Sequence, residues 1–219
     1  MKTKEIAILI PAFNEEPRID SVLEIVCSYK ASKKVVVIDD GSDDKTRLRA
    51  ERHPVVLLRH KRNLGKGAAL QTGINHIKHA ERWLFLDADL INLQHEHLNT
   101  LLHPLDNGEG IGMTVGKLLA GGKFHVDLAQ KYFGILNGQR ALTDWFVEQL
   151  PDLSWSRFGV EIFLSKTAHT RNIPVAEPLL TGLTHHTKGN KLGPVAGFHY
   201  RLQMYRECLY TLAVWRKYV

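Results

Sequence analysis

Two aspartates at the end of an apolar run are the residues best suited to chemistry in this chain of 219 residues. The run Leu84–Leu86 leads into Asp87 and Asp89, which are separated by one small residue. A buried strand would deliver both carboxylates to its carboxyl end, the edge of an open α/β sheet where ligands usually bind. Mg²⁺ takes oxygen ligands, commonly one or two carboxylates together with substrate phosphates. The pair therefore indicates a divalent metal site, and the alternative is a strand end followed by an aspartate that caps a helix.

The elements that would position this pair alternate between strand and helix over the first ninety residues. Apolar runs at 6–10, 35–38 and 55–58 predict short buried strands like the one before Asp87. Helical spacing follows each of them, from Pro17 through Tyr29, from the turn at 39–44 to about Arg52, and from residues 63–67 through about Ile77. Such alternation implies parallel pairing and right-handed crossovers. This half is predicted to be a doubly wound α/β unit that binds a nucleotide.

The second part of the chain is less regular. We expect a short helix ending near Pro104, a strand over 110–115, a flexible link over 118–122 and an ambiguous helix over 124–136. A helix around Trp145, a helix from 159 to about His169 and a strand pair or one bent strand over 175–183 follow. The tail is predicted to be a helix with one apolar face, made of Phe198, Leu202, Tyr205, Leu209 and Leu212. We expect one domain over 1–219, with a nucleotide-binding half at 1–92, an acceptor and metal half at 93–193, and a C-terminal helix at 194–219.

Composition narrows the class of protein. Hydrophobic residues make up 44% and charged residues 24%, and no apolar segment is long enough for a membrane span. No signal-peptide pattern follows Met1, and Cys27 and Cys208 sit in apolar helical contexts typical of buried thiols, so we expect a cytoplasmic protein. The net charge of +6 fits nucleic acid, an anionic membrane surface or a phosphorylated ligand. Nucleic acid is the least favoured, because aromatic residues do not alternate with basic ones.

Five segments in order resemble glycosyltransferase family 2, the nucleotide-sugar transferases of the GT-A fold. They are PAFNEE at 11–16, VIDDGS at 37–42, NLGKG at 63–67, DAD at 87–89 and GVE at 159–161. Each segment alone is weak, but the ordered set is specific, and it covers the first ninety residues more strongly than the rest. The resemblance implies a Rossmann-like α/β fold with a mostly parallel sheet flanked by helices. It also implies transfer of a hexose from a nucleoside-diphosphate sugar to a hydroxyl or phosphate acceptor, with Mg²⁺ or Mn²⁺.

The resemblance also implies which residues hold the nucleotide: Pro11, Ala12, Phe13, Glu15, Asp39, Lys66 and Asp87, with Asp40 as an additional candidate. Carboxylates can accept hydrogen bonds from ribose hydroxyls or from a base N–H. Lys66 stands at a helix start, where it can meet phosphate or ribose, and a plain surface lysine is the alternative. We expect Asp43 and Asp44 to form a solvated acidic turn that caps a helix.

By the same resemblance, Asp89 is the metal ligand and a catalytic residue, and Asp87 assists it or contacts ribose. Glu161 is a catalytic residue that orients the acceptor hydroxyl or acts as its base. The alternatives for Glu161 are a helix cap or an ion pair with Arg157.

The acceptor is assigned to Arg140 and Lys188 by the resemblance. Arg140 would clamp a phosphate or carboxylate of the acceptor, unless it is a helix-start arginine paired with Asp144. His185 resembles a third metal ligand, one that suits Mn²⁺ better than Mg²⁺, and its alternative is a surface histidine beside His186.

The sequence resembles more than one subfamily. The pattern resembles both glucosyl-3-phosphoglycerate synthases, which are retaining enzymes, and polyprenyl-phosphate sugar transferases, so the stereochemical outcome is undecided. A nucleotidyltransferase is a second reading, although the loop at 11–16 is acidic and has no glycine, whereas such enzymes usually have a glycine-rich basic loop there. A non-catalytic nucleotide-sugar-binding protein is a third. We expect the tail helix to pack on its own domain, with a homodimer contact as an extension and an anionic membrane as the weakest alternative.

Overall fold

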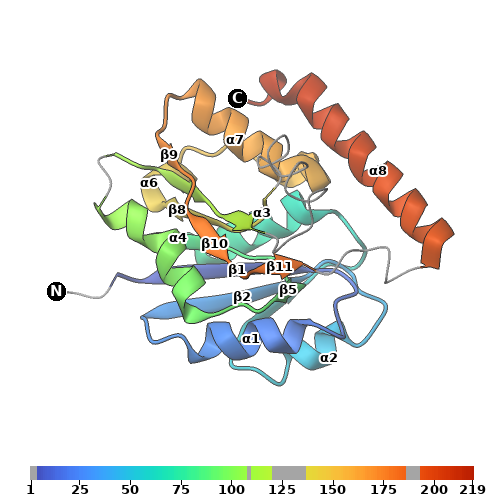
Figure 1. Cartoon of the computed structure of the whole chain (residues 1–219). Coiled ribbons are helices and arrows are strands. Elements are labelled where there is room, and N and C mark those ends of the chain that lie inside the picture. The colour runs from blue at the N-terminus through green and yellow to red at the C-terminus, as the bar shows by residue number, and fades with distance from the viewer. Residues whose placement is uncertain (1–3, 108–109, 120–136, 186–192) are drawn as a thin grey trace.

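A seven-stranded sheet runs through the centre of the protein, whose computed structural model describes residues 4–107, 110–119, 137–185 and 193–219 (Figure 1). The strand order is β3-β2-β1-β4-β8-β6-β9. Its strands are β1 (Ile6–Ala12), β2 (Lys33–Asp39), β3 (Val56–Arg59), β4 (Arg82–Phe85), β6 (Met113–Val115), β8 (Arg140–Thr143) and β9 (Val175–Ala176). The strands β3, β2, β1 and β4 are parallel, β8 is antiparallel to both of its neighbours, and β6 and β9 are parallel. The predicted mostly parallel α/β sheet is confirmed.

Helices cover both faces of this sheet. One face carries α1 (Ile19–Ser28), α2 (Thr46–Ala50) and α4 (His95–Asn107). The other carries α3 (Lys66–Ile77), α6 (Asp144–Val147) and α7 (Val160–Thr170), with the 3-10 helix η2 (Ser154–Gly159) leading into α7. Two small sheets pair β10 (Leu179–Thr181) with β7 (Lys117–Leu119) and β11 (Thr184–His185) with β5 (Leu90–Ile91). The chain ends in α8 (Gly193–Val214) and η4 (Trp215–Lys217), and α8 lies along the outside of the molecule (Figure 1).

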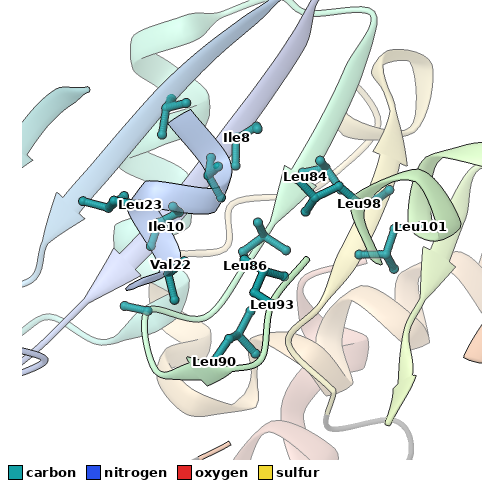
Figure 2. Packing of buried hydrophobic residues seen from close by; sticks show 14 of the residues in the cluster. Ile8, Ile10, Val22, Leu23, Leu84, Leu86, Leu90, Leu93, Leu98 and Leu101 are labelled. Atoms are coloured by element: carbon teal, nitrogen blue, oxygen red, sulfur yellow. The ribbon is translucent and has the colours of Figure 1, made fainter. Parts of the chain in front are cut away.

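Side-chain alternation along β1 explains why both faces are apolar. Ile8 and Ile10 pack with α1 on one face, whereas Ala7 and Leu9 pack with α3 on the other. Figure 2 shows Ile8 and Ile10 near Leu23 of α1, in the same buried cluster as residues of β4 and α4. A strand buried on both sides needs a continuous apolar run, which is the pattern that predicted these strands.

Several predicted elements have different bounds in the structure. The helix expected to end near Pro104 continues to Asn107, because Leu105 is buried in the core and anchors the last turn beyond the proline. The strand expected over 110–115 occupies only 113–115, and the helix expected to reach Arg52 ends at Ala50. The region 175–183 forms two short strands, β9 and β10, in different sheets. The expected helix over 124–136 lies outside the described residues.

The tail is helical and packs on its own domain as predicted, but the side that packs is not the predicted apolar face, of which the Phe198 side chain lies outside what the structure describes. Leu202, Tyr205, Leu209 and Leu212 are all exposed, by 56%, 51%, 66% and 45%. The side of α8 that packs on the domain is instead the one with Cys208 and Thr211. Among the described residues, no helix is both long enough and apolar enough to cross a membrane.

Candidate active site

The carboxyl ends of three parallel strands meet at one edge of the sheet. Ala12 at the end of β1 pairs with Asp39 at the end of β2, and Pro11 pairs with Ile38. β4, on the other side of β1, ends at Phe85 and is followed by Asp87 and Asp89. Parallel pairing thus brings the predicted nucleotide and metal residues of the first half to one side of the molecule.

Asp39 is completely buried, and only one of its two carboxylate oxygens accepts a hydrogen bond. Its Oδ1 accepts a hydrogen bond from the Ser42 N–H at 2.8 Å. Arg59 Nε lies 3.3 Å from Oδ2, within ion-pair range, but Oδ2 accepts no well-aligned hydrogen bond. A buried carboxylate oxygen without a hydrogen bond is costly, so this atom is well suited to accept one from a ribose hydroxyl or a base N–H.

Asp40 has a structural role instead. Its two oxygens accept hydrogen bonds from the backbone N–H groups of Leu64 and Gly65, at 2.9 and 2.7 Å. His60 lies between Asp40 and Thr72, with Nδ1 2.6 Å from Asp40 Oδ1 and Nε2 2.9 Å from Thr72 Oγ1. Asp40 and His60 therefore fix the loop that leads into α3.

Lys66, the first residue of α3, connects two carboxylates from distant parts of the chain. Its Nζ donates to Asp87 Oδ1 and, at 2.6 Å, to Glu161 Oε1 at the start of α7. Burial alone would lower the pKa of Lys66, but the charges and hydrogen bonds of Asp87 and Glu161 outweigh it and raise that pKa. Lys66 is therefore a firmly protonated cation at the site, and the alternative of a plain surface lysine is wrong. Glu161 forms its ion pair with Lys66. The alternative ion pair with Arg157 is wrong, because Arg157 pairs with Glu207.

Gln139 is a residue of this site that sequence reasoning missed. Its Nε2 donates to Asp87 Oδ2 at 3.0 Å, and its own Oε1 is buried without a hydrogen bond. The neighbouring Gly138 has no room for a side chain, because a Cβ there would lie 2.5 Å from both Asp87 Oδ2 and Lys66 Nζ. From this stretch the sequence analysis singles out only Arg140.

Arg140 points into the protein. It lies on β8 and donates from Nε to the Asn137 carbonyl at 3.0 Å and from Nη1 to Ser165 Oγ at 3.0 Å. Burial lowers the pKa of Arg140 to about 10, while the charges of Glu161 and Asp87 act in the opposite direction. The alternative of a helix-start arginine paired with Asp144 is wrong, because Arg140 belongs to a strand and Asp144 accepts its hydrogen bonds from Trp83 and Ala80.

Asp89 is nearly buried, and strand pairing brings residue 185 beside it. β11 is antiparallel to β5, with His185 directly opposite Leu90, the residue after Asp89. The backbone therefore carries a histidine from the far end of the sequence to the Asp-x-Asp segment, about 5 Å away from strand to strand. The His185 side chain lies outside what the structure describes, as do His186 and Lys188.

The loop after β1 is held by the acidic turn after β2. Glu15 forms an ion pair with Arg18 at 3.0 Å, and the Glu15 N–H donates to Thr46 Oγ1 at 2.7 Å. Asp44 caps the start of α2 by accepting from the Thr46 N–H at 2.9 Å, as expected for a capping turn. Phe13 lies in this loop, half-buried, next to the ends of β1 and β2.

Arg157 of η2 links α8 to the loop before Lys66. Arg157 donates from Nε to Glu207 Oε1 at 2.8 Å and from Nη1 to the Leu64 carbonyl at 3.1 Å. Its backbone has φ 47° and ψ −118°, a conformation in which a non-glycine residue is strained. A Cβ on Gly65 would lie 2.9 Å from the Arg157 Cα, so the loop before Lys66 packs directly against this strained residue.

Another group of possible metal ligands lies elsewhere. Within the described part of the chain, His79, Asp144 and Glu148 place ligand atoms within 4.8 Å of one another. They lie near the first residue of β4, at the opposite end of that strand from Asp87. His79 is 73% exposed and forms an ion pair with Asp144 at 2.5 Å, so we interpret this group as a surface ion pair outside the site.

Comparison with known sequences identifies the family of this chain. Residues 7–143, more than half of the chain, match the family described as glycosyl transferase family 2. The dolichyl-phosphate beta-glucosyltransferase of Dictyostelium discoideum is 24% identical over 96% of this chain and 76% of its own length. A dolichyl-phosphate beta-glucosyltransferase of Trichomonas vaginalis is 36% identical over 38% of this chain. The match spans only 30% of that relative's length.

Solved structures show the same fold over nearly the whole chain. Glucosyl-3-phosphoglycerate synthase from Mycobacterium tuberculosis, in complex with Mn²⁺, uridine-diphosphate-glucose and phosphoglyceric acid, matches with a TM-score of 0.76. It is 25% identical, and the match covers 99% of this chain and 81% of that one. A complex of the same enzyme with Mg²⁺ and uridine diphosphate matches with a TM-score of 0.68 at 24% identity, over 90% and 79% of the two chains.

Proposed function

This chain belongs to glycosyl transferase family 2, and we propose that it transfers a hexose from a nucleoside-diphosphate sugar to a hydroxyl or phosphate oxygen of an acceptor. The observation that carries the proposal is the cation Lys66 held between Asp87 and Glu161, at the edge of the sheet that also bears Asp39. A diphosphate brings negative charge to such an edge, and a fixed ammonium group stabilises it there. The acidic loop after β1 argues against nucleotidyl transfer.

In this proposal the nucleoside lies over the ends of β1 and β2. The buried Asp39 Oδ2 accepts a hydrogen bond from the nucleoside, and Pro11, Ala12 and Phe13 form the adjoining wall, with Glu15 behind them. Support comes from the side-by-side ends of the two strands and from the missing hydrogen bond at Oδ2. Lys66 and Asp87 then face the ribose and the phosphates.

The donor set fits a hard divalent cation. Asp89 supplies a carboxylate, and the pairing of β11 with β5 brings His185 to the neighbouring backbone position, so we propose these two residues as protein ligands. Mg²⁺ or Mn²⁺ bound there would neutralise charge on the departing nucleoside diphosphate. The carboxylate–imidazole pair favours Mn²⁺ over Mg²⁺, because imidazole is a softer ligand than oxygen.

Glu161 is proposed to face the acceptor. One of its carboxylate oxygens is bonded to Lys66, and the other would orient the acceptor hydroxyl or take its proton. We revise the role of Arg140 from direct contact to positioning, since its guanidinium bonds Asn137 and Ser165 inside the protein. Lys188 stays a proposed acceptor contact on the basis of sequence alone.

Uridine-diphosphate-glucose is the donor we propose first, together with an acceptor that carries a phosphate. Solved relatives contain this donor with phosphoglyceric acid or glycerol 3-phosphate, and sequence relatives are named for lipid phosphates. The net charge of +6 suits such anionic substrates. Both cysteines are free thiols in the structure, which is compatible with the cytoplasmic location that we propose.

Nucleotide binding and turnover test the proposal together. Uridine diphosphate should raise the melting temperature of the protein more with Mn²⁺ than without it. Asp89→Ala should abolish the metal-dependent part, whereas Asp43→Asn in the exposed turn should leave it unchanged. With donor and acceptor present, release of uridine diphosphate supports sugar transfer. Release of pyrophosphate would instead identify a nucleotidyltransferase, and binding with neither product would identify a non-catalytic binder.

A further inference from the structure

In the described part of the chain, α8 carries more exposed large apolar side chains than any other helix. Leu202, Tyr205, Leu209 and Leu212, which we call the outer face, are each between 45% and 66% exposed. Scattered exposed apolar residues are ordinary, but four on one stripe of a helix mark an interaction surface. Tyr210, also 55% exposed, lies on another side of the helix, next to Trp155.

The outer face is not the side by which α8 packs on the domain. At 100° per residue its four members centre about 180° from the position of Glu207 and about 140° from that of Thr211. Those two residues hold α8 on the protein: Glu207 accepts a hydrogen bond from Arg157, and Thr211 is fully buried against Gly159. The packed side of the helix is therefore already in place, and the outer face is its exposed side, on a helix that lies at the outside of the molecule (Figure 1).

Apart from one acid, the charged residues of this helix and of the η4 turn that follows it are positive. Between residues 193 and 219 the only acidic residue is Glu207, which is bonded inward to Arg157. The exposed Arg206 and the backbone position of Arg201 lie about 70° to either side of the centre of the outer face. Arg216 and Lys217 add exposed positive charge in η4.

We propose that the outer face of α8 docks on a lipid bilayer that carries anionic head groups. A leucine and tyrosine stripe flanked by arginines can insert its apolar side chains at the head-group boundary while the guanidinium groups reach the phosphates. A second copy of the chain suits the face less well, because pairing two outer faces would bring Arg206 of each copy together with no exposed acid to offset it. The packed side of α8 stays on the domain when the outer face docks.

Docking would also connect the membrane contact to the site. Glu207 connects α8 through Arg157 to the loop before Lys66. The helix that touches lipid would thus be joined by two hydrogen-bonding residues to the proposed nucleotide site. This inference goes beyond the transfer reaction, and it can be tested without donor or acceptor.

Flotation of the full chain with vesicles tests the proposal. We expect vesicles of phosphatidylcholine with phosphatidylglycerol to bind the protein at least tenfold more tightly than phosphatidylcholine alone, with release at high salt. Leu209→Glu should weaken that binding at least tenfold, and Arg206→Gln about fivefold. Leu48→Glu is the matched control, since Leu48 on α2 is 55% exposed and should be replaceable without effect.

Two outcomes would overturn the proposal. One is equal flotation of the wild type and Leu209→Glu, or no flotation with anionic vesicles. The other is a dimer in solution that Leu209→Glu dissociates without any vesicle binding, which would assign the face to a second copy. The melting temperature of each variant confirms that it is folded. A chain that floats but transfers no sugar would contradict the proposed function and leave this inference standing.

Discussion

At the scale of single residues, the centre of the candidate site is a cation between two acids. Lys66 has a raised pKa in the folded protein, so its favourable contribution to stability is fully present below its unfolded pKa of about 10.4. That contribution is lost only as the pH rises through the folded value. The Lys66 contacts should therefore be constant across neutral pH, and activity changes between pH 6 and 9 must come from other groups.

Glu161→Gln separates the charge of this residue from its hydrogen bond. The amide oxygen can still accept from Lys66, but the side chain can no longer take a proton from an acceptor hydroxyl. We expect kcat to fall about 100-fold while KM for the donor changes less than threefold, as for loss of a general base. Steady-state kinetics with uridine-diphosphate-glucose would measure both. A loss confined to KM for the acceptor would assign Glu161 an orienting role, and Glu148→Gln on the surface is the control.

Sequence reasoning reached some of these residues and not others for a physical reason. Asp39, Asp87 and Lys66 sit at predicted strand ends or helix starts, so local pattern alone directs them to one edge of the sheet. Gln139 and His60 act through contacts 52 and 20 residues away along the chain, which no local spacing reveals. The inward direction of Arg140 depends likewise on its pairing in the sheet.

At the scale of elements, helical spacing predicted the tail helix but not which side would be buried. Leu202 and Leu209 define an apolar stripe, and a stripe usually packs inward. Here Gly159 lets Thr211 approach closely: a Cβ on Gly159 would lie 2.0 Å from Thr211 Oγ1. Close backbone packing and the Arg157–Glu207 pair thus hold the polar side of α8, and these contacts between distant segments are not readable from periodicity.

Arg157 is the strained residue in that packing, and a pair of variants should reveal the strain. Arg157→Ala and Arg157→Gly both lose the bonds to Glu207 and Leu64, so both should be less stable than the wild type. Glycine adopts a positive φ without strain, which saves about 1–3 kcal/mol and outweighs its extra unfolded-state entropy of about 0.5–1 kcal/mol.

We therefore expect the free energy of unfolding of the Arg157→Gly variant, measured by urea denaturation, to be about 1 kcal/mol higher than that of the Arg157→Ala variant. Equal stability of the two variants would mean that the backbone at this position carries no strain.

At the scale of the whole molecule, the parallel half was predictable and the completion of the sheet was not. Strands alternating with helices require a parallel sheet, which gave β3, β2, β1 and β4. The antiparallel β8 inserts between β4 and β6, although β6 comes first along the chain. Neither the short run Arg140–Thr143 nor its neighbours carries a signal for that order. Strand β11 returns to Asp89 by the same kind of long-range pairing.

Asp106 joins three parts of this assembly. From α4 it accepts hydrogen bonds from Lys4, just before β1, and from Arg82 in β4, both at 2.7 Å. Burial would raise the pKa of Asp106, but the hydrogen bonds and charges of Lys4 and Arg82 outweigh it and lower that pKa. A lowered pKa means that the stabilisation is present above the unfolded pKa of about 3.9 and is lost as the pH falls through the folded value.

Asp106→Asn should therefore cost stability at pH 6 and almost none near pH 3. Because the Asp106 side chain is 40% exposed, solvent screening limits the cost at pH 6 to about 0.5 kcal/mol. Urea denaturation of both proteins at the two pH values measures the difference, with Asp43→Asn in the exposed turn as the control. A difference that stays constant down to pH 3 would show that the asparagine acts through packing, and that the charge of Asp106 does not hold β1, β4 and α4 together.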